Sequence, residues 1–167
     1  MSNHQGTQVV LIADDDEDDL FLIRNAFHVS GIPVEFRSVS DGEELMEYLF
    51  CRNKYKDSFL SPLPSLILLD LNMPRKDGRE ALAEIKAHPL LRQIPVVVLT
   101  TSNEKADVQQ CYLMGASSYV TKPNSFSTLV DTIRIMLRYW IETVELPSPH
   151  HLSGSKDGIC AERRCKC

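Results

Sequence analysis

The chain has 167 residues, of which 43% are hydrophobic and 25% are charged, and its formal net charge is −5. This balance is typical of a folded globular protein, and the length suits one compact domain and a tail. The charge provides no basic field for nucleic acid, and no apolar run approaches the roughly twenty residues that span a bilayer. The start, MSNHQGTQ, lacks a secretory signal, and an odd count of five cysteines suggests no disulfide framework. We therefore expect a cytoplasmic protein that binds neither nucleic acid nor membrane.

Short apolar runs alternate with helix-length segments along the whole chain. The predicted strands cover residues 9–13, 34–39, 65–71, 95–101 and 117–121. Apolar residues at helical spacing predict helices over about 17–29, from 41, from 78 to 88, over 103–114 and from 125. The first, third and fourth runs are almost continuous Val, Ile and Leu, as expected for strands covered on both faces. Five strand–helix repeats predict a doubly wound α/β protein with a five-stranded parallel sheet.

Local signals refine the ends of two of these helices. Gly31 is a plausible stop for the first helix. Asp41 can cap the second helix, and Glu44, three residues on, can complete a capping box. The last helix has so many apolar positions, Ile135 and Tyr139 among them, that either a larger core or a partner-facing surface accounts for it.

After the last helix the composition turns to Ser, Pro, His, Gly and charged residues. We therefore expect one domain over residues 1–146 and a flexible tail over 147–167. The tail carries His150, His151 and the cysteines of a C-x4-C-x-C pattern. That spacing is not a zinc-finger spacing, so disorder with adventitious metal or redox chemistry is the favoured interpretation.

Six consecutive acids, D-D-D-E-D-D, follow the first predicted strand. Asp14 and Asp15 stand at the strand end, where they form either a solvated loop or part of a site. Asp16 faces either a metal's water shell or solvent. The acids over 17–19 fall in the first turn of a helix, where negative charge interacts favourably with the helix dipole.

The other strands also end in residues that carry chemistry. Asp70 follows the third strand, Thr100 ends the fourth, and the fifth leads to Lys122. Each has an ordinary explanation when taken alone: Asp70 can form a turn, Thr100 can be a β-branched strand residue, and Lys122 can be a surface lysine. The carboxyl ends of parallel strands share one edge, however, which is where open α/β sheets bind ligands. Together with Asp14 and Asp15, these residues suit Mg²⁺ binding and phosphoryl transfer to a carboxylate.

Four motifs now show a family resemblance: ADD (13–15), LLDLNMPRKDG (68–78), VVVLTT (96–101) and YVTKP (119–123). In this order they resemble the receiver domain of two-component response regulators, the CheY-like family, over about residues 7–146. The resemblance implies a flavodoxin-like (βα)₅ fold that accepts a phosphoryl group from a sensor histidine kinase. Its own chemistry would be limited to self-phosphorylation and slow self-hydrolysis, so we do not expect an enzyme in the usual sense.

The resemblance also assigns roles to individual residues. It makes Asp70 the phosphoacceptor, and makes Asp14, Asp15, Asp70 and the backbone carbonyl of Asn72 the ligands of Mg²⁺ or Mn²⁺. A separate set would bind the phosphoryl group and switch: Thr100, Lys122 and Tyr119, the aromatic that turns inward as Thr100 moves. Two positions would tune dephosphorylation, Asn72 and Ser102. The Lys122–Pro123 peptide bond would be cis.

A closer resemblance suggests a partner. The stretches LILLDLNMPRKDGREALAEIK, VVVLTTS and RYWIETVELP are similar to single-domain regulators paired with phytochromes of the cyanobacterial type. Those proteins receive their phosphoryl group from a light-regulated histidine kinase. They often form homodimers through the fourth helix, the fifth strand and the fifth helix. This resemblance therefore implies a phytochrome kinase as partner and a homodimer.

Three other functions fit the residues less well. An aspartate-nucleophile phosphatase of the haloacid dehalogenase type needs a second acid two residues after the nucleophile, where this chain has Asn72. A nucleotide-binding domain would carry a Gly-rich phosphate loop after the first strand, and none is present. A pseudo-receiver, an interaction module that is not phosphorylated, would have no need of the complete set of site residues.

Overall fold

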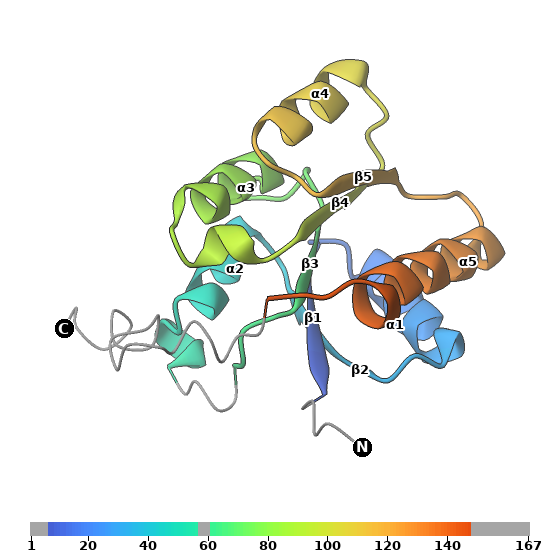
Figure 1. Cartoon of the computed structure of the whole chain (residues 1–167). Coiled ribbons are helices and arrows are strands. Elements are labelled where there is room, and N and C mark those ends of the chain that lie inside the picture. The colour runs from blue at the N-terminus through green and yellow to red at the C-terminus, as the bar shows by residue number, and fades with distance from the viewer. Residues whose placement is uncertain (1–6, 57–60, 148–167) are drawn as a thin grey trace.

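The computed structural model describes residues 7–56 and 61–147 (Figure 1). The predicted tail therefore lies outside the described residues apart from Pro147, and so do its histidines and cysteines. Within the described ranges, no helix is both long enough and apolar enough to cross a bilayer.

The predicted parallel sheet is confirmed. The strands are β1 (Gln8–Ala13), β2 (Val34–Val39), β3 (Leu66–Leu69), β4 (Val96–Thr100) and β5 (Ser118–Thr121). They pair in the order β2-β1-β3-β4-β5, and every pairing is parallel. The order changes direction at β1, so β1 and β3 are neighbours although β2 lies between them in the chain. This arrangement opens a ligand site at the carboxyl ends of β1 and β3.

Helices cover both faces of the sheet (Figure 1). They are α1 (Glu17–Ser30), α2 (Gly42–Leu49), α3 (Gly78–Ala87), α4 (Lys105–Leu113) and α5 (Phe126–Leu137). A π-helical turn, Arg138–Thr143, extends α5, and short 3₁₀ helices occupy Asn53–Tyr55 and Leu91–Gln93. α1 and α5 lie side by side on one face, and α2, α3 and α4 cover the other.

Alternation along the strands explains the nearly continuous apolar runs. Val10 and Ile12 of β1 pack under α1 and α5, whereas Leu11 and Ala13 pack under α2 and α3. β3 and β4 divide in the same way, so each supplies apolar side chains to two separate clusters. A strand that is buried on both faces needs apolar residues at every position.

The helix caps agree with the sequence in part. Asp41 caps α2 by accepting a hydrogen bond from the backbone N–H of Glu44 at 2.8 Å. The predicted capping box does not form there, because the Glu44 carboxylate accepts instead from the backbone N–H and hydroxyl of Ser40, at 2.6 and 2.7 Å. A complete capping box occurs at α3, between Asp77 and Glu80.

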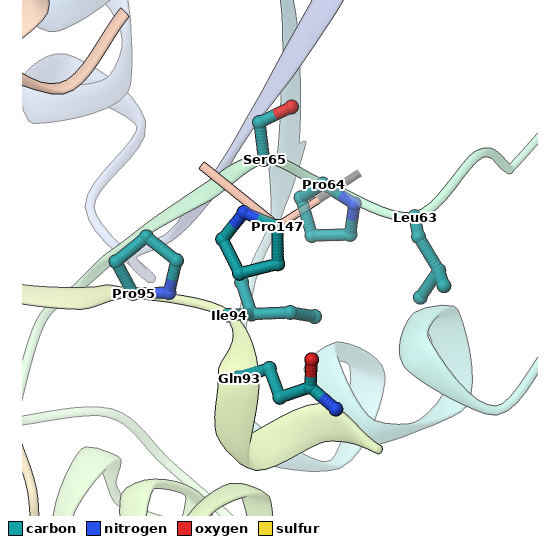
Figure 2. A pocket seen from close by; sticks show the side chains of 7 residues that line it. All are labelled: Leu63, Pro64, Ser65, Gln93, Ile94, Pro95 and Pro147. Carbon is teal, nitrogen blue, oxygen red and sulfur yellow. The ribbon is translucent and has the colours of Figure 1, made fainter. Parts of the chain in front are cut away.

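A small pocket lies at the amino ends of β3 and β4, opposite the edge where Asp70 and Thr100 stand (Figure 2). Its lining consists of Leu63, Pro64, Ser65, Gln93, Ile94, Pro95 and Pro147. None of these side chains is charged, and Figure 2 shows three proline rings at its wall. The pocket therefore offers no charged side chain to phosphate or a divalent cation, and it is separate from the predicted site.

Candidate functional site

The structure brings the predicted strand-end residues together at the carboxyl edge of the sheet. The backbone N–H of Asp70 donates to the carbonyl of Ala13 at 2.9 Å, and that of Lys122 donates to the carbonyl of Thr100 at 2.7 Å. The Lys122 Nζ lies 2.7 Å from Asp14 Oδ2 and 3.3 Å from Asp70 Oδ2. Residues from the ends of β1, β3 and β5 therefore meet at one point.

Three carboxylates form a cluster that fits a divalent cation. One oxygen from each of Asp14, Asp15 and Asp70 lies within 4.8 Å of the other two. Asp14 and Asp70 are buried, and Asp15 is exposed. A hard cation such as Mg²⁺ prefers a few oxygen ligands and keeps coordination positions for water and phosphate. The donor set and its partial exposure suit that chemistry.

The backbone after β3 fixes the Asp70 carboxylate. The N–H of Leu71 donates to Asp70 Oδ1 at 2.7 Å, and the N–H of Asn72 is 3.5 Å from the same oxygen. Oδ2 faces the Lys122 ammonium. The two oxygens of Asp70 thus have different partners, which restricts rotation of the carboxylate.

Burial and charge act in opposite directions at this site. Burial raises the pKa of Asp14 to about 6, although the hydrogen bond and positive charge of Lys122 favour its ionised form. Burial alone would lower the pKa of Lys122, but hydrogen bonds to Asp14 and Asp19 and the nearby negative charges raise it. Lys122 is therefore positively charged at neutral pH. Its charge only partly offsets the cost of burying the Asp14 carboxylate.

Sequence analysis missed the third partner of this lysine. Lys122 Nζ donates to Asp19 Oδ2 at 2.6 Å. Asp19 lies in the first turn of α1, as predicted, but its carboxylate turns back toward the end of β5. Asp16 caps that turn by accepting from the N–H groups of Asp18 and Asp19, at 2.9 and 3.2 Å. The one feature of the sequence that could have indicated this contact is the acid Asp19 in the first turn after the cap residue Asp16.

The loop after β4 connects the buried Thr100 to α4. The Thr100 hydroxyl accepts from the backbone N–H of Ser102 at 3.4 Å. The Ser102 hydroxyl donates to Asp107 Oδ2 at 2.6 Å, and the Ser102 carbonyl accepts from the Tyr119 hydroxyl at 2.9 Å. The Arg79 guanidinium also binds Asp107, through Nε at 3.1 Å and Nη2 at 2.7 Å. Arg79 lies within the stretch LILLDLNMPRKDGREALAEIK and Asp107 lies in none of the quoted motifs, but sequence analysis assigned a role to neither residue.

One prediction about this region was wrong. No peptide bond among the described residues is cis, so the Lys122–Pro123 bond is trans. The cis form was implied by the family resemblance, and it would direct the lysine toward the site. In this structure the trans bond, with the Lys122 N–H held by the Thr100 carbonyl, already lets Nζ reach all three carboxylates.

The loop between β3 and α3 is anchored at both ends. The Gly42 N–H donates to the Lys76 carbonyl at 3.0 Å, and the Gly78 N–H donates to the Leu71 carbonyl at 2.9 Å. Arg75 has a φ of 63° and forms an ion pair with the buried Asp41 carboxylate. These contacts connect α2 to the loop that contains the predicted carbonyl ligand.

Comparisons with known proteins agree with this geometry. Residues 10–134 match the model of the response regulator receiver domain. The chain is 41% identical to the response regulator Rcp1 of Synechocystis sp. over 141 residues, which is 84% of this chain and 94% of that protein. The solved Mn²⁺-bound form of Rcp1 superposes with a TM-score of 0.77 at 41% identity, covering 84% of this chain and 99% of that one.

A second solved structure is the phosphorylated cyanobacterial phytochrome response regulator RcpA. It superposes with a TM-score of 0.80 at 40% identity, covering 86% of this chain and 100% of that one. Both of these relatives are response regulators. The match of fold, motifs and length shows that the chain belongs to the family of response regulator receiver domains.

Proposed function

We propose that the protein is a phosphorylation switch in which Asp70 accepts a phosphoryl group from the histidine of a sensor kinase. The observation that carries the proposal is the arrangement around Asp70, whose carboxylate faces both a lysine ammonium and two further carboxylates. An Asp70 oxygen forms the new O–P bond as the histidine N–P bond breaks, and the leaving imidazole takes up a proton.

The surrounding residues have complementary roles in this proposal. Lys122 pairs with the phosphoryl oxygens, and the Thr100 hydroxyl donates a hydrogen bond to one of them. A divalent cation held by Asp14, Asp15, Asp70 and the Asn72 carbonyl supplies positive charge to the same oxygens. Mg²⁺ is the proposed cation, and Mn²⁺ can replace it, in keeping with the Mn²⁺-bound form of the similar protein Rcp1.

The switch itself is proposed to use Tyr119 and the loop after β4. Movement of Thr100 toward the phosphoryl group displaces the Ser102 backbone, which is the present partner of the Tyr119 hydroxyl. Asn72 and Ser102 tune the rate of dephosphorylation. The Ser102 hydroxyl acts from a position bound to Asp107, so its effect depends on whether that hydrogen bond persists.

The proposal also names a kinase partner, the extent of the domain and a location in the cell. A phytochrome is the proposed kinase, because the similar protein RcpA is a phytochrome response regulator. The receiver domain is proposed to span residues 1–146, since β1 begins before the matched range and the π-helical turn ends at Thr143. A cytoplasmic location is also part of the proposal, and it suits the buried Cys111 thiol, which forms no disulfide.

A homodimer through α4, β5 and α5 completes the proposal. Exposed apolar residues occur on both helices, among them Leu113 of α4, 88% exposed, and Ile135 of α5, 69% exposed. Exposed apolar side chains on both helices support the proposal that a second copy covers this face.

The alternative functions are not favoured. The side chain two residues after Asp70 is the amide of Asn72, which cannot protonate a leaving group as a haloacid dehalogenase phosphatase requires. An interaction module that is not phosphorylated would not need a lysine and three carboxylates gathered at one point.

Incubation with acetyl phosphate and Mg²⁺ tests the proposed phosphoacceptor. We expect one hydroxylamine-sensitive phosphoryl group per chain, absent in Asp70→Asn and retained in the control Asp18→Asn, which removes an exposed acid. The mass of the intact protein and of its peptides measures this. Label on another residue, or label that forms equally well in EDTA, would contradict the proposal.

Phosphotransfer from purified kinases tests the partner. A phytochrome kinase in its two light states should phosphorylate Asp70 at different rates, and faster than an unrelated histidine kinase does. Equal rates from both kinases would exclude a specific phytochrome pairing but would leave the phosphoacceptor assignment intact.

A further inference from the structure

The Lys122 ammonium is shared among three carboxylates that have different tasks. Asp14 at 2.7 Å and Asp70 at 3.3 Å belong to the cluster that fits a divalent cation. Asp19 at 2.6 Å does not belong to that cluster. Of the three, Asp19 alone is therefore free to hold the lysine while the other two bind a cation.

The position of Asp19 is set by the start of α1. The Asp16 carboxylate accepts hydrogen bonds from the Asp18 and Asp19 N–H groups and so fixes the first turn of the helix. The Asp19 side chain is 32% exposed, whereas that of Lys122 is 8% exposed. The contact thus lies at the rim of the site, between the helix that follows β1 and the residue that follows β5.

We infer that Asp19 is a positioning residue that retains the Lys122 ammonium at the rim of the site when Asp14 and Asp70 bind a divalent cation. The inference rests on the proposed function. An ammonium and a divalent cation repel each other and compete for the same oxygens. Asp19 gives the ammonium a partner outside that competition, so the lysine stays close to the oxygens of an incoming phosphoryl group.

Without Asp19 the lysine has only Asp14 and Asp70 as partners. It then competes more strongly for the oxygens that the cation needs, and the protein should bind the cation more weakly. A helix-dipole role alone would not have this effect, since Asp18 occupies the same turn and has no contact with Lys122 among the described ion pairs. Asp18→Asn is therefore a matched control for charge and helix position.

Thermal stabilisation by Mg²⁺ measures cation binding without relying on phosphorylation. In Asp19→Asn the Kd for Mg²⁺, fitted from the dependence of stabilisation on Mg²⁺ concentration, should rise about fivefold, the size expected for a partly exposed ion pair. In Asp18→Asn it should change less than about twofold. Equal shifts in the two variants would overturn the inference, because they would show that net charge alone matters.

A double-mutant cycle tests whether Asp19 acts through the lysine. In a Lys122→Ala background, Asp19→Asn should shift the fitted Kd for Mg²⁺ no more than Asp18→Asn does. A full Asp19 effect in the absence of Lys122 would overturn the inference.

Phosphorylation by acetyl phosphate provides the second measurement. At saturating Mg²⁺, Asp19→Asn should lower the maximal labelling rate while leaving the donor concentration at half-maximal rate unchanged. An unchanged maximal rate would contradict the positioning role. If the wild-type protein is not labelled on Asp70, the proposed function fails, whereas the Mg²⁺ titration still decides the role of Asp19.

Discussion

Gly78 occupies a position where the backbone of α3 approaches Asp70 and Leu71 too closely for any side chain. A Cβ built on Gly78 would lie 2.1 Å from the Asp70 carbonyl oxygen and 2.8 Å from the Leu71 Cα. Both contacts are to backbone atoms, so relief requires movement of Asp70 itself. The glycine of the DG pair at the start of α3 is thus required by the geometry of the site.

We predict that Gly78→Ala lowers the free energy of unfolding by about 3 kcal/mol, the upper range for overpacking, and reduces labelling of Asp70. Gly31→Ala is the control, since Gly31 has a φ of 72° and no atom within 4 Å of a built Cβ. It should cost about 1 kcal/mol for the left-handed backbone and leave labelling intact. Urea denaturation measures the free energy of unfolding of the two variants. Equal losses of stability would contradict the close-approach argument.

Single residues also show how far sequence analysis reached into the site. Asp14, Asp70, Thr100 and Lys122 were predicted to meet because parallel strands end at one edge, and the structure brings them together. The Asp19 contact could not be predicted in the same way. It depends on the rotation of the first turn of α1 and on the path of a long lysine side chain, and neither follows from the type of residue.

At the scale of an element, the start of α2 is a small hub of polar contacts around Glu44. Its carboxylate accepts hydrogen bonds from Ser40 and, at 2.7 Å, from the Tyr55 hydroxyl, and forms an ion pair with Lys54. Burial alone would raise the pKa of Glu44, but these partners outweigh it and lower the pKa to about 2. Glu44 therefore connects α2 to the 3₁₀ helix that follows it.

This hub predicts a pH-dependent contribution to stability. The folded-state pKa of Glu44 is about 2 and the ordinary value is 4.5, so the contribution is fully present above pH 4.5 and is lost as the pH falls toward 2. Glu44→Gln should lower the free energy of unfolding at pH 7 by about 1 kcal/mol. The difference in free energy of unfolding between Glu44→Gln and the wild type should become smaller below pH 4.5. Denaturant unfolding over this range measures it, with Glu43→Gln as a neighbouring exposed control. A difference that does not vary with pH would refute the assignment.

Elements were the most predictable level of the structure. Each predicted strand exists, and the observed bounds differ by no more than a few residues because apolar runs mark burial directly. Helix starts were less certain. The capping box was predicted at Glu44 but formed at Glu80, since Ser40 offers Glu44 both a hydroxyl and an N–H. Side chains at a helix start have several partners in reach, and sequence spacing does not rank them.

At the scale of the whole molecule, the sheet separates two apolar clusters, and the exposed apolar residues lie outside both. Ile135 of α5 is 69% exposed although α5 contributes Ile133 and Met136 to one cluster. The helix therefore has one face for the core and another that is open. The proposed homodimer would cover that open face.

Sedimentation velocity with beryllofluoride, a phosphoryl mimic, tests the homodimer. We expect the wild-type protein to sediment faster when Mg²⁺ and beryllofluoride are both present, because the mimic shifts the α4–β5–α5 face toward association. Ile135→Asp should stay monomeric, since a buried unpaired charge is costly at an interface. Val29→Asp, at an exposed position on α1, is the control and should behave as the wild type. A dimer in Ile135→Asp, or a wild-type species that ignores the mimic, would rule out this interface.

The Asp107 carboxylate of α4 joins residues of neighbouring elements near the site. Arg79 of α3 and Ser102 of the loop after β4 both donate to it, and the Ser102 carbonyl receives the Tyr119 hydroxyl of β5. The contacts of α3, the loop after β4 and β5 thus depend on one another, so we expect a movement of one of them to affect the other two. Thermodynamic linkage makes this relation reciprocal. If Asp70 is phosphorylated as proposed, a target that binds these residues more tightly in the phosphorylated form makes phosphorylation itself more favourable.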